Sequence, residues 1–471
     1  MEIKLRLLRN SFLFICTVLV IFSSTIPVSA QTPSGPSYII QSGDTLGTIA
    51  DRFGVSQDDI IRVNGIVNPD SLAVGSSIII PGYEDVAGVL TTVNLPLGQN
   101  LRALTIRYRI PLDTLTKINR ITSPSEIFAG ASLILPEQNS QSAQVSRGAE
   151  LTGQSLLELA VVQGLNPWSI QTTNSISSAW ELLPGELAFY PNGDDTGIAG
   201  LISPMLSNVD ISPLPLVQGS TIVFRVSTRI PMMITGKLGD RELHFEQESE
   251  NQYVALQGIH ARADIGLTSF SLTGTTETGQ VFQFEDRLIV QSGNFANDPE
   301  LTVDPKGVDP NILDPEDEQL FSDWTASASP QKLWAGVWQT PIDEPICIKS
   351  WYGNRRSYNG SGYIYFHTGV DYGTCTTNLD AHAAAAGTII FSGPLTVRGG
   401  SVIIDHGWGV YTGYWHLSSE SVSVGDHVEA GQIIGQIGAT GLRVTGPHLH
   451  FEVIVNGVQV NPLDWLENQY P

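Results

Sequence analysis

The 471-residue sequence is poor in positive charge: it has 24 lysine and arginine residues against 47 aspartate and glutamate residues, a net charge of −23. Nucleic acids and anionic membranes bind proteins chiefly through lysine and arginine, so we expect no nucleic acid partner. The sequence also lacks a phosphate-binding loop of the Gly-x-x-x-x-Gly-Lys type. Its 41% hydrophobic and 15% charged residues favour several folded domains over a disordered polymer.

Beyond the first thirty residues, no stretch is apolar enough to cross a membrane. Residues 1–30 have the features of a signal peptide: three basic residues precede an apolar run over residues 12–22, and Val28-Ser29-Ala30 offers the small residues that a signal peptidase reads. An uncleaved anchor is disfavoured, because polar residues and a proline interrupt the run before it reaches the roughly 20 residues of a spanning helix. We therefore expect a secreted protein, cell-wall associated or periplasmic, without membrane contact after cleavage.

Histidine is also scarce, yet seven of the nine histidines fall between His367 and His450. Residues 447–455 are rich in β-branched and aromatic side chains and predict a strand, which places His448 and His450 on one face. The extended run 363–371 likewise places His367 and Asp371 on one face. A His-x-His pair alone is weak evidence, since a lone histidine is more often structural. Together, the two motifs offer three ligands and an open fourth position, which suits a catalytic zinc.

Three segments also carry a family resemblance. His367-Thr368-Gly369-Val370-Asp371, then Tyr414-Trp415-His416-Leu417, then residues 445–452 resemble, in this order, the lysostaphin or LytM-type zinc metallopeptidases, glycyl-glycine endopeptidases that cleave peptidoglycan peptides. The similarity covers about residues 333–467. It implies a mainly-β catalytic domain, expected at residues 331–471, with zinc as cofactor. It also implies that His367, Asp371 and His450 bind the metal and that His416 and His448 are catalytic.

The residues near the proposed ligands indicate which side chains could transfer protons. No glutamate lies beside them in a His-Glu-x-x-His arrangement, so an imidazole, which titrates near neutral pH, is the natural proton carrier. We expect one of His416 and His448 to take a proton from the attacking water. The other would donate to the oxyanion or the leaving amine, and the sequence leaves open which does which. His406 is expected to be structural, and His427 solvated.

The three cysteines include Cys16 in the predicted signal peptide. Removal of the signal peptide leaves two cysteines, Cys347 and Cys375, which flank the first metal motif. An even pair in an exported protein predicts a disulfide, and the alternative is a thiolate zinc ligand. We favour the disulfide, because the ligand set is already complete without sulfur.

The N-terminal part of the chain, up to residue 191, contains a repeat with a period of 55 residues. Glycine recurs at positions 43, 98 and 153, asparagine at 64, 119 and 174, glycine at 75, 130 and 185, and proline at 81, 136 and 191. The first copy resembles a LysM module, a small α/β (βααβ) fold that binds N-acetylglucosamine-containing glycans. We expect modules at residues 37–82, 92–137 and, in divergent form, 147–192.

The residues of the first copy agree with that fold. Leu46, Ile49, Ala50 and Phe53 have the spacing of a helix with one apolar face, and a short strand follows at residues 78–80. Neutral sugars are bound by aromatic surfaces and hydrogen bonds, so glycan binding is compatible with an acidic chain. We expect it to be strongest in the first copy and weakest in the third. The alternative is that the modules are spacers or bind another protein.

Two further segments connect these parts. Residues 200–293 contain short strand signals split by turn residues and predict an all-β sandwich-like domain. At most it would position or occlude the active site, and a plain spacer is the simpler role. Residues 294–330 are rich in Asp, Glu and Pro, with Asp-Pro recurring every five residues, and predict an extended, solvated linker. Such a spacer would let a tethered catalytic domain reach nearby peptide stems.

The sequence therefore predicts a multidomain zinc metalloendopeptidase, a peptidoglycan hydrolase that LysM modules tether to glycan. Its partners would be the glycan strands and stem peptides of peptidoglycan. Two alternatives are a catalytically silent LytM-like activator of a separate cell-wall amidase and a glycan-binding scaffold. Activators of that kind usually lack metal ligands, whereas all five site positions are filled here.

Overall fold

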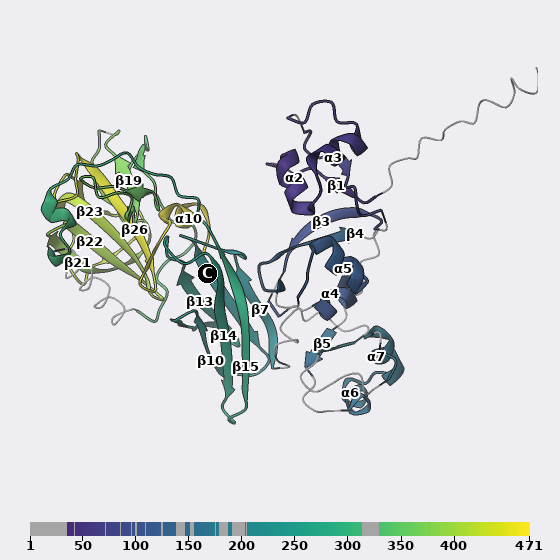
Figure 1. The fold of residues 1–471 in the computed structure, drawn as a ribbon. Helices are drawn as coiled ribbons and strands as arrows, with labels where there is room; N and C mark the ends of the chain where they lie inside the picture. The colour runs from purple at the N-terminus through teal and green to yellow at the C-terminus, as the bar shows by residue number, and fades with distance from the viewer. Residues whose placement is uncertain are drawn as a thin grey trace, which may run out of the picture. The chain divides into compact units, whose positions relative to one another are not determined.

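The computed structural model describes residues 35–137, 147–150, 155–178, 187–190, 203, 205–312 and 329–471, apart from a few positions inside these ranges. The predicted signal peptide and residues 313–328 of the predicted linker lie outside the described residues. The fold is mainly β with few helices (Figure 1). In the described part of the chain, no helix is both long and apolar enough to span a bilayer. The chain forms two compact units, divided near Thr91, with residues 135–140 returning to the first.

The first unit begins with a strand, two helices and a strand: β1 (Ser37–Ile39), α2 (Leu46–Phe53), α3 (Gln57–Asn64) and β2 (Ser77–Ile79), with β1 antiparallel to β2. Helix α2 starts at Thr45, whose hydroxyl accepts a hydrogen bond from the Thr48 N–H, and ends at Gly54 in the left-handed conformation. Its buried residues are the four apolar ones that the sequence predicts.

The order strand, helix, helix, strand recurs twice further along the chain. The second series is β3 (Val89–Asn94), α4 (Leu101–Tyr108), α5 (Leu112–Asn119) and β4 (Ser132–Glu137). The third is β5 (Arg147–Glu150), α6 (Leu156–Gln163), α7 (Pro167–Thr173) and β6 (Leu187–Tyr190). Strands β5 and β6 pair in antiparallel fashion.

The repeated asparagine has one role in all three series. Its Nδ2 donates to the carbonyl four residues earlier, at 2.9, 3.0 and 2.8 Å for Asn64, Asn119 and Asn174. The same amide group exchanges two hydrogen bonds with the backbone of one residue in the returning strand, which is Ile79, Ile134 or Phe189. The side chain thus joins the second helix to the strand, which gives a physical reason for the fixed spacing of 55.

Residues 205–291, here called the two-sheet region, contain strands joined by turns and no helix. These are β7 (Leu206–Ser212), β8 (Leu216–Val217), β9 (Thr221–Thr228), β10 (Met232–Leu238), β11 (Arg241–Leu243), β12 (Glu246–Ser249), β13 (Gln252–Gly258), β14 (Gly266–Thr276) and β15 (Val281–Gln291). One sheet has the order β11-β10-β14-β15-β8 and the other β12-β13-β9-β7. Buried side chains of both sheets form one core, in which Phe224 stacks on Phe270 with ring centroids 5.6 Å apart.

The C-terminal region, residues 329–471, is built around one large sheet (Figure 1). Its strands are β16 (Ile348–Ser350), β19 (Val370–Gly373), β20 (Asp380–His382), β21 (Gly387–Leu395), β22 (Gly399–Gly407), β23 (Val410–Glu420), β24 (His427–Val428), β25 (Ile433–Ile437), β26 (His448–Val455) and β27 (Val458–Val460). The main order is β16-β19-β26-β23-β22-β21-β24. Strand β26 is buried along its whole length, and it is followed after β27 by helix α10 (Pro462–Glu467).

The two-sheet region and the C-terminal region share a hydrophobic core. Val254 and Leu256 of β13 belong to the same buried cluster as Val460 and Trp465. The Trp465 Nε1–H also donates to Thr221 Oγ1 at 3.0 Å. This packing differs from the plain spacer that the sequence suggested, because a spacer would bury no common apolar surface.

The first part of the predicted linker also differs from expectation. Its backbone pairs with the segment that contains β17 (Arg355–Arg356): the Asp298 N–H donates to the Arg355 carbonyl at 2.9 Å, and the Leu301 N–H donates to the Ser357 carbonyl at 3.0 Å. A short 3₁₀ helix, η3 (Pro305–Val308), follows. Composition alone predicted a solvated chain here, and it could not report these specific backbone partners.

Candidate metal centre

The register between β19 and β26 builds the centre. Asp371 stands opposite His450, and Gly373 stands opposite His448. His367 lies just before β19 and after the short strand β18 (Tyr365–Phe366), so the predicted extended run is two short strands rather than one. The break contains Gly369, where a Cβ atom would lie 2.2 Å from the Phe451 carbonyl oxygen. Glycine therefore allows the chain to approach β26 closely enough to bring His367 in.

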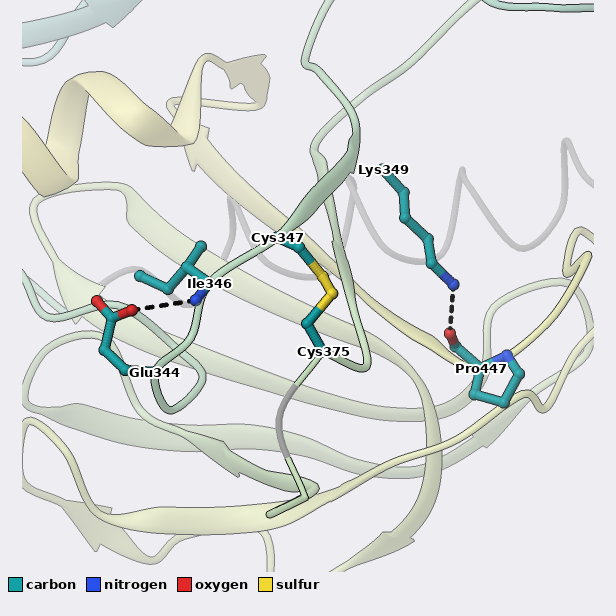
Figure 2. The surroundings of a disulfide bond; sticks show 6 residues. All are labelled: Glu344, Ile346, Cys347, Lys349, Cys375 and Pro447. Atoms are coloured by element: carbon teal, nitrogen blue, oxygen red, sulfur yellow. Dashed lines mark hydrogen bonds between the residues drawn. A yellow bond between two sulfur atoms is a disulfide. The ribbon is translucent and has the colours of Figure 1, made fainter.

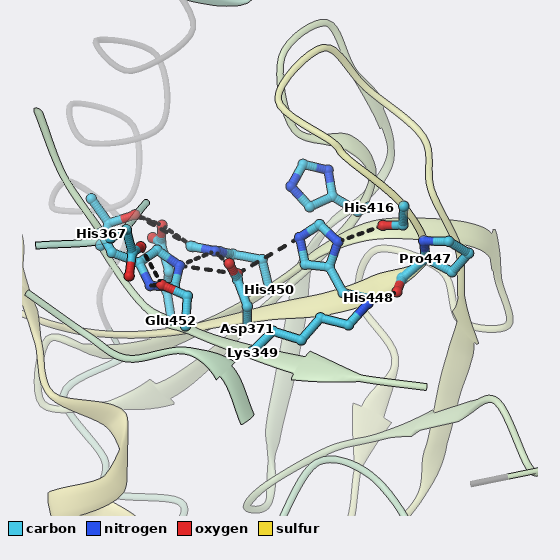
Figure 3. Close-up of polar contacts among 12 residues, drawn as sticks. Lys349, His367, Asp371, His416, Pro447, His448, His450 and Glu452 are labelled. Atoms are coloured by element: carbon cyan, nitrogen blue, oxygen red, sulfur yellow. Dashed lines mark hydrogen bonds and ion pairs between the residues drawn. The ribbon is translucent and has the colours of Figure 1, made fainter. Parts of the chain in front are cut away.

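Three donor atoms converge there (Figure 3). His367 Nε2 lies 3.0 Å from Asp371 Oδ1 and 2.9 Å from His450 Nδ1, and the last two atoms are 2.7 Å apart. All three side chains are buried, with at most 8% of each residue exposed. Two imidazole nitrogens and one carboxylate oxygen are a donor set that suits zinc, and three protein ligands leave a fourth position open.

Each histidine of the trio is held through its other nitrogen. His367 Nδ1 donates to the Trp351 carbonyl at 2.9 Å and lies 3.1 Å from Ser350 Oγ. His450 Nε2 lies 2.9 Å from Glu452 Oε1, which also accepts a hydrogen bond from Thr368. Such partners fix the ring orientation and leave the converging nitrogen unprotonated, which is the form that binds a metal.

The carboxylate of the trio is held by an arginine. Arg356 Nη2 donates to Asp371 Oδ2 at 2.7 Å, on the oxygen that faces away from the converging atoms. Sequence reasoning overlooked this residue, and it overlooked Ser350 and Glu452 as well. Only Glu452 had a readable signal, because it lies two residues after His450 on the same strand and therefore on the same face.

His416 and His448 lie beside the trio, with ring centroids 4.8 Å apart (Figure 3). His448 Nε2 is 3.7 Å from Asp371 Oδ1, and the His416 ring is 6.2 Å from the His450 ring. His416 has a φ of 66°, a left-handed conformation that is uncommon for a non-glycine residue in a strand. Both rings line one pocket together with His367 and His450.

Comparison with known proteins agrees with this geometry. Residues 365–462 match the family model described as Peptidase family M23, and residues 38–81 and 98–136 match the LysM domain model. The C-terminal region contains a peptidase family M23 domain. The resemblance that the sequence suggested is thereby confirmed for this M23 domain and for two LysM domains.

Named relatives match only part of this chain. DD-carboxypeptidase/endopeptidase Mpg of Neisseria meningitidis serogroup B is 45% identical over 97 residues, 21% of this chain and 22% of the relative. Peptidoglycan DD-endopeptidase ShyC of Vibrio cholerae is 39% identical over 115 residues, 24% of this chain and 26% of the relative. The solved catalytic domain of lysostaphin from Staphylococcus simulans is 27% identical, with a TM-score of 0.21, covering 31% of this chain and 98% of that chain. The chain thus spans about a quarter of the curated relatives it matches.

M23 peptidases are zinc metallopeptidases, and the donor trio of the M23 domain fits that metal. The protonation states of two ligands agree, whereas burial alone would lower the pKa of the third, His450, but the carboxylates of Asp371 and Glu452 raise it. Burial lowers the pKa of His367 to about 4, although Asp371 opposes the shift. Burial alone would raise the pKa of Asp371, but the adjacent His367 and His450 hold it well below its usual value. At neutral pH the domain therefore presents a neutral imidazole and a carboxylate, both ready to bind a cation.

The two neighbouring histidines of the M23 domain are also neutral. Burial, followed by the proximity of His448 and His450, lowers the pKa of His416 to about 3. Burial also lowers the pKa of His448. Each ring has Nδ1 at 2.8 Å from a carbonyl, that of Thr440 for His416 and that of Gly446 for His448. Since a carbonyl only accepts, Nδ1 carries the proton and Nε2 is free of it in both rings.

Two further histidines of the M23 domain, His406 and His427, were not expected to be catalytic. His406 Nδ1 donates to the Ala386 carbonyl at 2.7 Å, and the ring packs on Trp338 at a centroid distance of 4.7 Å. The His427 side chain is 54% exposed. Both agree with the predictions for these residues.

Cys347 and Cys375 form a disulfide (Figure 2), which confirms the pairing predicted from the sequence. The bond joins the start of β16 to the segment after β19. In the same surroundings Lys349 Nζ donates to the Pro447 carbonyl at 2.9 Å, next to His448. The disulfide therefore ties the segment before β16 to the segment after β19, the strand that carries Asp371.

Proposed function

We propose that this protein is a zinc-dependent endopeptidase that hydrolyses amide bonds in peptidoglycan stem peptides or crosslinks. The observation that carries the proposal is the convergence of three donor atoms beside two neutral histidines in one pocket of an M23 domain. Backbone carbonyls hold the two histidines through Nδ1, which leaves Nε2 of both rings for chemistry in the pocket.

His367, Asp371 and His450 would hold the metal. When bound, zinc polarises a scissile carbonyl and lowers the pKa of a water molecule toward neutrality. Glu452 and Ser350 orient the two imidazoles, and Arg356 orients the carboxylate. These contacts fix which atom of each ligand faces the pocket.

His416 and His448 would carry out the proton transfers. Both present an unprotonated Nε2 at neutral pH, so either can accept a proton from the attacking water. Once protonated, the same ring can donate to the leaving amine. His448 Nε2 lies closer to the ligands, at 3.7 Å from Asp371 Oδ1, and we assign it the role nearer the reacting water.

The bond that is cut would be a D,D-crosslink. The names of the relatives Mpg and ShyC include DD-carboxypeptidase/endopeptidase and DD-endopeptidase, which supports this bond. A glycyl-glycine bond is the alternative substrate, since lysostaphin is also among the relatives.

LysM domains would tether the enzyme to N-acetylglucosamine-containing glycan. Residues 147–192 would be a third, divergent LysM module, because Asn174 makes the same hydrogen bonds as Asn64 and Asn119. The two-sheet region would be a sandwich-like domain that supports the catalytic domain. Export by the predicted signal peptide would place the protein at the cell wall or in the periplasm.

Incubation with purified sacculi tests the proposal. New amino termini, detected by labelling and identified by mass spectrometry of the released fragments, should appear with the native protein. They should vanish with a chelator and with His448→Ala, while the matched variant His427→Ala, at an exposed histidine, should retain activity. Binding without any new amino termini would overturn the proposal.

The same assay addresses the two alternatives. An amidase activator would release fragments only after a separate amidase is added, and a scaffold would bind without release. Neither alternative needs four histidines that line one pocket beside a buried aspartate, so the geometry does not favour them.

A further inference from the structure

The segment between the two-sheet region and the M23 domain lies against the metal centre. Residues 297–308, here called the strap, form isolated bridges with the chain around β17, at Asn297 with Arg355 and at Leu301 with Tyr358. Between these bridges Asp298 points into the domain and is buried, with 8% of the residue exposed. The strap lies outside residues 365–462, so the family match does not include it.

Three buried side chains of the M23 domain donate to the Asp298 carboxylate. Oδ2 accepts from Ser350 Oγ at 2.6 Å and from Arg356 Nε at 3.0 Å. Oδ1 accepts from Asn354 Nδ2 at 2.6 Å. A carboxylate buried among three donors is held in one orientation and in turn holds each donor.

Two of these three donors also contact proposed metal ligands. Arg356 uses Nε for Asp298 and Nη2 for Asp371 Oδ2, at 2.7 Å, so one guanidinium bridges the two carboxylates. Ser350 Oγ donates to Asp298 and lies 3.1 Å from His367 Nδ1. Asp298 is therefore one side chain away from both Asp371 and His367.

The charges explain why a carboxylate is needed at this point. Arg356 is buried, with 8% of the residue exposed, and its positive charge lies beside Asp371. If Asp371 were the only anion near it, the arginine would compete with a metal cation for the same carboxylate. Asp298 supplies a second negative charge, so that Arg356 can orient Asp371 without withdrawing its charge from the metal.

We propose that Asp298 is a positioning residue of the metal centre, which the strap contributes from outside the family-matched part of the domain. It acts through Arg356 on Asp371 and through Ser350 on His367. This inference rests on the proposed function, specifically on metal binding by His367 and Asp371.

The test compares Asp298→Asn with Glu300→Gln in the full-length exported protein. Both variants remove one negative charge from the strap, but Glu300 is exposed, which makes it the matched control. The zinc dissociation constant is measured by competition with a chromogenic chelator. We expect Asp298→Asn to weaken zinc binding by about 10- to 100-fold. Glu300→Gln should leave the dissociation constant within about 2-fold of the native value, because an exposed charge contributes little.

A second readout separates positioning from general stability. The visible absorption of the cobalt-substituted protein reports the geometry of the ligands, and we expect Asp298→Asn to change it and Glu300→Gln to leave it unchanged. If Asp298→Asn does not fold, Ser350→Ala serves as the test variant instead. It removes only the hydroxyl oxygen that links Asp298 to His367, and it should weaken zinc binding by about 10-fold.

The outcomes distinguish this inference from the proposed function. If the native protein binds one zinc and Asp298→Asn binds it equally tightly with the same cobalt spectrum, the role of Asp298 is wrong and the proposed function stands. An unchanged affinity in Ser350→Ala, where that variant decides, has the same meaning. If the native protein retains no zinc, both the proposed function and this inference fail.

Discussion

His450 Nε2 lies 2.9 Å from the carboxylate of Glu452, and both side chains are buried. Burial alone would raise the pKa of Glu452, but the hydrogen bond from His450 holds it below its usual value, so the group is an anion. This anion makes the imidazole a better electron donor to a metal. We expect Glu452→Gln, which keeps the shape and loses the charge, to weaken zinc binding by about 10-fold.

Chelator competition measures this change, and Glu429→Gln provides the control, since the Glu429 side chain is 78% exposed. Equal zinc affinity in Glu452→Gln and the native protein would mean that Glu452 serves only to satisfy the buried ring.

His416 and His448 should affect catalysis without affecting metal content. Their rings lie 4.8 Å apart beside the donor trio, and neither belongs to the trio itself. We expect His416→Ala and His448→Ala each to lower the hydrolysis rate by at least about 100-fold, the usual size of a lost acid-base group. Both should still bind one zinc, as measured by atomic absorption. Loss of zinc in His416→Ala would show that it is a ligand instead.

The disulfide should contribute measurably to stability. Cys347 and Cys375 are 28 residues apart, and closing a loop of that size in the unfolded chain stabilises the folded state by about 2–4 kcal/mol. We expect the double variant Cys347→Ser/Cys375→Ser to unfold at correspondingly lower denaturant concentration. When the wild-type protein is unfolded without reductant, thiol titration should detect no free thiol from Cys347 or Cys375. A native and a double variant of equal stability would contradict the prediction.

Much of the metal centre could be predicted from short-range spacing. His448 and His450 lie two apart on a strand, and alternation alone places them on one face. The helices of the first LysM domain likewise depend on local patterns, whereas the disulfide followed from the even number of cysteines left after the signal peptide. His367 and Asp371 were also brought together, although through two short strands and a close glycine contact rather than one continuous strand.

The rest depends on contacts between residues far apart in the sequence. Asp298 lies 73 positions before Asp371, in a segment whose composition indicates a solvated linker, and no periodicity connects the two. Arg356 resembles any arginine at a strand end until the fold places it between two carboxylates. The shared core of β13 and α10 is equally long-range, because each apolar face alone only indicates burial against something.

The repeated asparagines offer a prediction about the LysM domains. Asn64→Ala, Asn119→Ala and Asn174→Ala would each leave the N–H and the carbonyl of one strand residue without their side-chain partner, at a cost of about 1–3 kcal/mol per repeat. Amide hydrogen exchange should show faster exchange only in the module that carries the change, so that each variant is the control for the others. Equal protection in Asn174→Ala and the native protein would remove the support for a third module.

His406 should make the stability of the M23 domain depend on pH. Burial lowers the pKa of His406 to about 4, although its hydrogen bond to the Ala386 carbonyl opposes the shift. The unfolded chain, with a histidine pKa near 6.5, takes up the proton first as the pH falls, and this uptake favours unfolding. The stabilising contribution is therefore complete above about pH 6.5 and is lost progressively as the pH falls toward about 4.

The difference between the native protein and His406→Gln isolates this term, because the other titrating groups are common to both. Between pH 7.5 and pH 5 we expect the native protein to lose about 2 kcal/mol of unfolding free energy relative to the variant. Urea unfolding at several pH values, with a chelator present so that metal release does not contribute, measures the difference. If that difference does not change with pH, then His406 is protonated to the same extent in the folded and unfolded states, and its burial beside Trp338 does not hold it neutral.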